Sequence, residues 1–152
     1  MGMEETKKRA LRMLEKRDYA RGELVDKLVR KGEPVENAEA VADRMVELGV
    51  INDANFAGMV VRHYAAKGYG RARITEELRR RKIGRDLWDA AFEELPEQAD
   101  ALDRLLRSKL RGAAPEGDAL RKATDALRRR GFSWEQINAV VERLRSEAAD
   151  ET

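Results

Sequence analysis

The sequence predicts an all-α protein built from three tandem three-helix repeats in an elongated, slightly curved array. Two observations lead to this prediction. Apolar residues recur at helical spacing along almost the whole chain, and no stretch alternates with the period of two that is typical of a half-buried strand. In addition, three segments of the chain superimpose on one another, which is the signature of a repeat architecture.

The helical periodicity divides into about nine segments of roughly 10 to 16 residues each. Glycines lie between these segments, where a left-handed C-cap or a turn belongs: Gly32, Gly49, Gly68, Gly70, Gly84, Gly112, Gly117 and Gly131. Asp53 is expected to cap the helix that carries Phe56. Ser133 and Gln136 have the spacing of a capping box for the last helix.

The internal similarity is a triplication. The superimposing segments are Leu24-x3-Leu28-Val-Arg-Lys-Gly32, Ile74-x3-Leu78-Arg-Arg-Arg-Lys82 and Ala123-x3-Leu127-Arg-Arg-Arg-Gly131, at offsets of 50 and 49 residues. A third helix closes each unit, ending at Leu48, Leu95 or Leu144, and only the first unit carries an insertion, around Pro34 to Asn37. We therefore expect repeats at residues 1–49, 50–96 and 97–152, the last with a short acidic tail. Such small units gain stability by sharing apolar faces with their neighbours, and this stacking predicts the elongated array.

Composition narrows the class of protein. A chain of 152 residues is long enough to bury an apolar core. It contains no cysteine, which excludes disulfides and thiolate metal sites and favours a reducing compartment. No window approaches the roughly 18 apolar residues of a membrane span, and the N-terminus lacks the apolar region of a secretory signal. We expect a cytoplasmic protein without membrane contact.

The distribution of charge is more informative than its total. Charged residues make up 39% of the chain, yet the net charge is only +2. Residues 62–85 hold nine Lys or Arg against two Glu, a local balance of +7, whereas residues 86–103 hold seven acids and no Lys or Arg. The third repeat shows the same order more weakly, while the first has a neutral front and an acidic third helix.

The basic segments suggest a face that binds phosphates or an acidic protein groove. Its candidate residues are Arg71, Arg73, Arg79, Arg80, Arg81, Lys82, Arg85, Lys122, Arg128, Arg129 and Arg130. The alternative is structural: cations in the last turn of a helix complement its dipole, by about 0.3 to 1 kcal/mol each. Three adjacent arginines exceed what one helix end can use.

Tyr69 is the aromatic candidate for stacking on bases. It lies in Gly68-Tyr69-Gly70-Arg71, and a loop flanked by glycines tends to present its side chain; covering a neighbouring helix is the structural alternative. Tyr64 and Phe132 lie on apolar stripes and are expected in the core.

The residues do not favour an enzyme. His63 is the single histidine, so it has neither a histidine nor a cysteine partner for metal binding or nucleophilic catalysis. Gly68-x-Gly70 lacks the further residues of a dinucleotide fingerprint or a phosphate loop. We expect no catalytic site, no metal and no cofactor.

Several motifs, taken in order, resemble the RecX family. Ala10-Leu11-x-x-Leu14-x-x-Arg17-Asp18-Tyr19, followed by Glu23-Leu24-x3-Leu28-x2-Lys31-Gly32, is similar to the family's opening. Leu48-Gly49-Val50-Ile51-Asn52-Asp53 with Phe56-Ala57 resembles its junction between repeats. Lys67-Gly68-Tyr69-Gly70 through Leu78, and Arg130-Gly131-Phe132-Ser133 through Ile137, resemble its second and third units. One departure is Ala20, which stands where the family often has a Ser or Thr cap.

The resemblance implies three three-helix repeats and a role as a negative modulator of the RecA recombinase. The implied partner is the RecA nucleoprotein filament, whose growth, ATPase and strand exchange the protein would block. The alternative is a stand-alone DNA-binding helical array without a recombinase partner, which would bind bare single or double strands tightly. For the leading hypothesis we expect a monomer that binds bare DNA only weakly.

Overall fold

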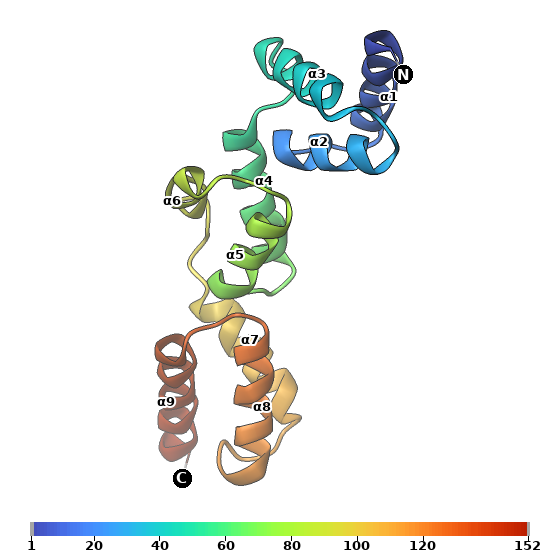
Figure 1. Ribbon diagram of the computed structural model, residues 1–152. Helices are drawn as coiled ribbons and strands as arrows, with labels where there is room; N and C mark the ends of the chain where they lie inside the picture. The colour runs from blue at the N-terminus through green and yellow to red at the C-terminus, as the bar shows by residue number, and fades with distance from the viewer. Residues whose placement is uncertain (1, 152) are drawn as a thin grey trace. The chain divides into compact units, whose positions relative to one another are not determined.

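The computed structural model describes residues 2–151, and within this range it contains nine α-helices, one 3-10 helix and no strand (Figure 1). The helices are α1 (Met3–Lys16), α2 (Arg21–Arg30), α3 (Val35–Glu47), α4 (Asp53–Ala66), α5 (Arg71–Arg80), η1 (Arg85–Leu87), α6 (Trp88–Phe92), α7 (Ala99–Leu110), α8 (Gly117–Arg129) and α9 (Trp134–Asp150). The predicted all-α class and the three successive three-helix repeats, α1–α3, α4–α6 and α7–α9, are confirmed.

Two helix lengths differ from the expected 10 to 16 residues. Helix α6 has only 5 residues, because Gly84 is extended, η1 takes up the next three residues, and Leu95 precedes a proline and is disfavoured in helical geometry. Helix α9 has 17 residues and runs past Leu144, since no glycine or proline follows to stop it. The insertion expected near Pro34 forms the N-cap and first turn of α3.

The assignment of Asp53 as the cap of α4 is wrong. Asn52 has that role: its side-chain oxygen accepts the amide of Asn55 at 3.1 Å. The Asp53 carboxylate instead accepts the backbone N–H of Arg21 at 2.9 Å, at the first residue of α2. Because Ala20 has no polar side chain for this purpose, the carboxylate supplied by α4 replaces the missing cap of α2.

The first and third repeats each enclose a core of their own. In the first, Leu24 and Leu28 of α2 are fully buried against α1 and α3. In the third, Leu106, Leu127 and Ile137 come from α7, α8 and α9, which lie side by side in Figure 1. The Ser133–Gln136 capping box is confirmed, with both backbone amides bonded at 3.1 Å, and Phe132 is buried as expected.

In all three repeats, a residue with left-handed backbone geometry follows the second helix at the equivalent position. Gly32, Lys82 and Gly131 have φ angles of +100°, +60° and +97°. In each case the amide of the next residue bonds the carbonyl five positions earlier: Glu33 to Leu28, Ile83 to Leu78, and Phe132 to Leu127. This Schellman geometry favours glycine, so Lys82 is the exception that needs a reason.

Within the described residues the chain divides into two compact units. One comprises residues 2–60 with 77–94, and the other residues 61–76 with 95–151. The last turn of α5, η1 and α6 therefore pack with the first repeat, and the first turn of α5 packs with the third. The predicted residues fall into two groups, one in each unit.

Candidate nucleic-acid interface

The first group, which we call the first basic cluster, comprises Arg79, Arg80, Arg81, Lys82 and Arg85 at the end of α5 and in η1. Its members differ in their contacts. Arg80 and Arg81 donate to the same carboxylate oxygen of Glu77, at 2.7 and 2.9 Å, and Glu77 is only 1% exposed. Part of the arginine triplet is therefore structural, because a buried carboxylate needs charged partners.

The other members of the first basic cluster are exposed. Arg79, Lys82 and Arg85 form no ion pair with the described residues. The guanidinium carbons of Arg79 and Arg85 lie 5.3 and 5.4 Å from the ring centroid of Trp88. A hydrogen bond from the Trp88 indole to the carbonyl of Ile83, at 3.0 Å, fixes that ring. The cluster thus presents cations around a fixed aromatic ring.

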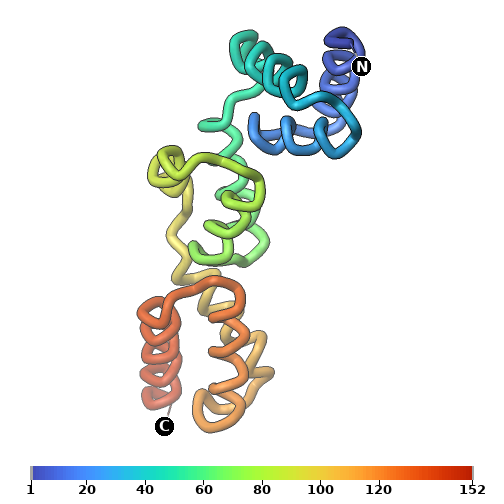
Figure 2. The backbone as a smooth tube through the Cα atoms, in the orientation of Figure 1, coloured from blue at the N-terminus to red at the C-terminus, as the bar shows by residue number. Residues whose placement is uncertain are grey.

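The second basic cluster comprises Arg71, Arg73, Arg128, Arg129 and Arg130. Two turns bring these residues together, as Figure 2 shows for the segments after α4 and α8. The amide of Gly70 donates to the carbonyl of Arg130 at 2.8 Å, and that of Ala72 to the carbonyl of Gly131 at 3.2 Å. A Cβ at Gly70 would lie 2.6 Å from the Gly131 backbone, so glycine at this crossing is a steric requirement.

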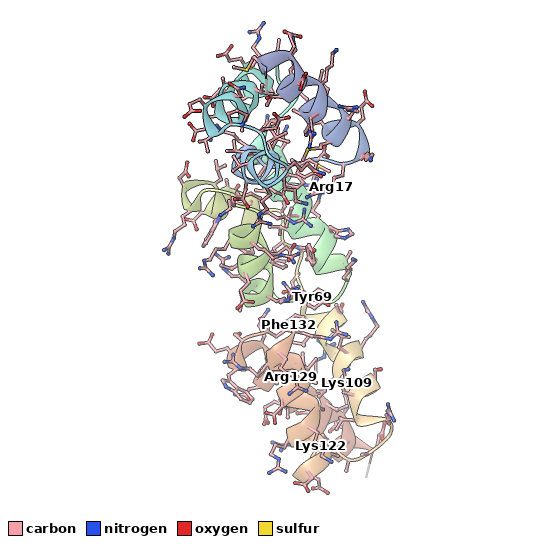
Figure 3. The ribbon with its side chains drawn as sticks, turned by 45° about the vertical axis from the view of Figure 1, so that its right-hand side comes forward. Arg17, Tyr69, Lys109, Lys122, Arg129 and Phe132 are labelled. Carbon is pink, nitrogen blue, oxygen red and sulfur yellow. The ribbon has the colours of Figure 1, made fainter. Side chains whose placement is uncertain are left out.

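Tyr69 lies half-buried in the second cluster, close to Phe132 in Figure 3. The guanidinium carbons of Arg73 and Arg130 lie 5.3 and 5.4 Å from the centre of its ring. Arg130 also donates to the carbonyls of Lys67 and Gly68, at 3.4 and 3.3 Å. Tyr69 therefore already carries two cationic neighbours, and its role in the structure includes holding the turn together.

Lys122 and Arg129 are exposed and form no hydrogen bond or ion pair with other described side chains. Arg129 belongs to the second cluster. Lys122 is seven positions earlier on α8, about two helical turns away, and Figure 3 places it apart from Arg129 and Tyr69. The structure brings the other predicted residues of this unit together and leaves Lys122 outside.

Sequence reasoning missed the two tryptophans. Trp134 begins α9, is 47% exposed, and has the guanidinium carbon of Arg128 5.1 Å from its ring centre. Arg128 and Arg79 occupy equivalent positions of their repeats, so an arginine lies over a tryptophan in both clusters. In the sequence, each tryptophan follows a basic segment within ten residues, which could have indicated its role. Only the fold shows that each ring lies beside the arginines of that segment.

Other arginines are held by internal ion pairs. Hydrogen bonds to Asp103 and Glu147 raise the pKa of Arg107, and one to Asp100 raises the pKa of Arg143. A hydrogen bond from Arg21 likewise lowers the pKa of the Asp43 carboxyl. These pairs link α7 to α9 and α2 to α3, and they involve none of the arginines of the two basic clusters.

The described residues contain no cluster of three or more His, Cys, Asp or Glu that would suit a metal ion. His63 is exposed and meets the Tyr64 ring edge-on, with the ring centroids 5.2 Å apart. Among residues 2–151, no helix combines the length and apolar character that crossing a membrane requires.

Comparison with known proteins gives one consistent result. Residues 7–45 match the family model of the first RecX three-helix domain, and residues 52–91 match that of the second. The Regulatory protein RecX of Halorhodospira halophila is 34% identical over 135 residues, covering 87% of this chain and 83% of the relative. That of Pseudomonas entomophila is 34% identical over 134 residues, covering 87% and 86%.

Solved structures agree on the fold. The crystal structure of RecX from Lactobacillus salivarius superimposes with a TM-score of 0.83 at 20% identity, covering 93% of this chain and 96% of that one. A second crystal structure of regulatory protein RecX gives a TM-score of 0.82 at 21% identity, covering 92% and 73%. The chain therefore belongs to the RecX family of regulatory proteins.

Proposed function

We propose that this protein is a negative modulator of the RecA recombinase that binds the nucleoprotein filament and blocks its growth, ATPase and strand exchange. Family membership supports the regulatory role. The observation that supports filament binding is the pair of basic clusters, each with exposed cations and a tryptophan under an arginine of equivalent position. Cations beside aromatic rings suit a nucleic-acid strand, because the cations meet phosphates and the rings meet bases.

The helix dipole does not account for these cations. Arg71 and Arg73 lie in the first turn of α5, where the dipole disfavours positive charge, and that turn contains no acid. Arg85 lies beyond the end of α5, in η1. Phosphate binding explains cations at both ends of the helix, whereas dipole complementation explains only those in the last turn.

The acidic residues that follow the first cluster provide a surface of opposite sign. Asp86, Asp89, Glu93 and Glu94, which belong to the same compact unit as that cluster, are all exposed. A filament offers both phosphate and protein, so a protein with basic and acidic surfaces matches it better than it matches bare DNA. The role needs neither catalysis nor a cofactor, and it places the protein in the cytoplasm with its partner, as a monomer.

The deciding experiment is a titration of RecA ATPase on single-stranded DNA. A molecule that blocks growth acts only where subunits add, so we expect half-inhibition far below one molecule per recombinase. The stand-alone DNA-binding alternative requires saturation of the DNA. Half-inhibition at about one molecule per recombinase or more would contradict the growth-blocking mechanism.

A further inference from the structure

A cleft of about 510 Å³ lies between α2 of the first repeat and the end of α5. Both segments belong to the same compact unit. All eight residues that line the cleft are charged: Arg17, Glu23, Asp26, Lys27, Arg30, Arg80, Arg81 and Lys82. Figure 3 shows Arg17 where α1 leads into α2. In the sequence, the first part of the first repeat has little net charge. In the fold, however, cations of this repeat lie across the cleft from those of the first basic cluster.

Some of the cations that line the cleft have no carboxylate partner. Glu23 pairs with Arg17 at 2.8 Å, and Asp26 pairs with Arg30 at 3.0 Å. The Lys27 ammonium has no carboxylate partner among the described residues and lies 5.3 Å from the Tyr19 ring centre. Lys82, on the other side of the cleft, likewise has no ion-pair partner among the described residues.

Lys82 provides an independent indication. Its φ of +60° places a side chain in the left-handed region, at the position where the other two repeats have Gly32 and Gly131. Its Cβ also lies only 3.1 Å from where a Cβ on Gly22 of α2 would be, so α2 comes close to this turn. A lysine kept at a glycine position, in close contact and facing a charged cleft, indicates a functional demand on its ammonium group.

We infer that this cleft binds the backbone phosphates of a nucleic-acid strand, with Lys27, Arg30 and Lys82 as contacts. The inference rests on the proposed function and extends it to the first repeat. Every lining residue is charged, which favours an anionic strand over an apolar side chain. The regularly spaced phosphates of a strand match cations that line both sides of the cleft.

The test compares variants that remove cleft cations with a matched control. Lys27→Gln with Arg30→Gln removes two cations from the cleft. Lys8→Gln with Arg12→Gln removes two exposed cations from α1 of the same repeat, outside the cleft. Binding of a labelled single-stranded oligonucleotide is measured by fluorescence anisotropy at several salt concentrations.

Each phosphate contact to a single strand contributes a slope of about −0.7 to log K against log salt, or a factor of about four at roughly 0.15 M relative to 1 M salt. The cleft variant should bind about fifteen-fold more weakly, with a slope smaller by about 1.4. The α1 control should keep the wild-type slope. A cleft variant with an unchanged slope would overturn the inference.

Lys82→Gly separates binding from folding. It removes one cation and relieves the left-handed backbone, so we expect weaker binding, by about four-fold, together with a higher melting temperature. Wild-type affinity in this variant would contradict the inference. Because this variant is expected to be more stable than wild type, unfolding would not explain a loss of binding.

Two further measurements identify the kind of molecule that binds in the cleft. Binding of the variants to free recombinase tests an acidic protein surface: loss there, with wild-type binding to the oligonucleotide, would refute a nucleic-acid strand. Inorganic triphosphate, measured by calorimetry, tests a free phosphate compound, and tighter binding of triphosphate than of the oligonucleotide would also refute it. If wild type inhibits RecA ATPase while the cleft variants keep their salt slope, the cleft inference fails and the proposed function stands.

Discussion

The arginine triplet at the end of α5 contains two kinds of residue, and this difference is open to measurement. Arg79 is exposed and has no carboxylate partner among the described residues. Arg80 and Arg81 both hold Glu77, but their side chains are 72% and 22% exposed. Replacement by methionine keeps length and helix propensity and removes every donor, so it isolates the support that each arginine gives to the buried carboxylate.

A hydrogen bond to a charged group is worth about 1.5–3 kcal/mol. We expect Arg81→Met to lower the free energy of unfolding by that amount. Arg80→Met should cost about 0.5–1 kcal/mol, because its exposed guanidinium is screened by water. The double variant should cost about 3–5 kcal/mol, since it leaves the Glu77 charge buried without these partners. Arg79→Met, the matched control, should stay within about 0.5 kcal/mol of wild type.

Urea unfolding followed by circular dichroism gives these free energies. Adding Glu77→Gln to the double variant should restore stability in part, because a buried amide costs less than a buried charge. If the double variant unfolds within about 1 kcal/mol of Arg79→Met, Glu77 does not depend on these arginines and the reasoning is refuted.

Four other outcomes follow from the fold. Asp53→Ala should destabilise the protein by about 1 kcal/mol, because α2 loses its cap, and an unchanged urea midpoint would contradict this. Glu33→Ile should destabilise the protein by about 1–3 kcal/mol, because the 3%-exposed Glu33 accepts the buried Thr6 hydroxyl at 2.9 Å and lies 3.4 Å from the Arg9 guanidinium, and isoleucine replaces neither contact; an unchanged urea midpoint would count against it. Gly131→Ala should cost more than about 2 kcal/mol, because its Cβ would lie 2.4 Å from the Arg73 amide, and a near-native melting temperature would show that the crossing is less tight than described. In a Trp88→Phe variant, emission from Trp134 should be quenched when single-stranded DNA binds, since bases stack on exposed rings; binding without quenching would remove Trp134 from the interface.

The helical class, the three repeats and the Ser133–Gln136 capping box were predictable because each depends on residues close in sequence. Asp53 shows where such reasoning stops. Its position before an apolar helix favours a local cap, but its carboxylate accepts the amide of Arg21, 32 residues earlier. Helix α6 is shorter than the periodicity predicts for a local reason, because η1 takes up the residues before it and Pro96 follows soon after its end.

The sequence predicts the candidate site as a set of basic residues, and it does not predict how these residues are arranged. Arg79, Arg80 and Arg81 look equivalent in sequence, and only the buried position of Glu77 separates them. Lys27 and Arg30 belong to a repeat with little positive charge of its own, and the fold brings them to Lys82. Most of this arrangement depends on contacts between elements that are distant in sequence. Helical periodicity and local charge counts do not predict such contacts.

The most direct test of the account compares the affinity of this protein for three targets under one salt condition: the assembled RecA filament on single-stranded DNA, the same DNA alone, and RecA without DNA. A regulator of the filament should bind the assembled filament more tightly than either component, and Arg79→Gln with Arg129→Gln should weaken that binding. Equal or tighter binding to bare DNA would contradict filament regulation and favour a stand-alone DNA-binding protein.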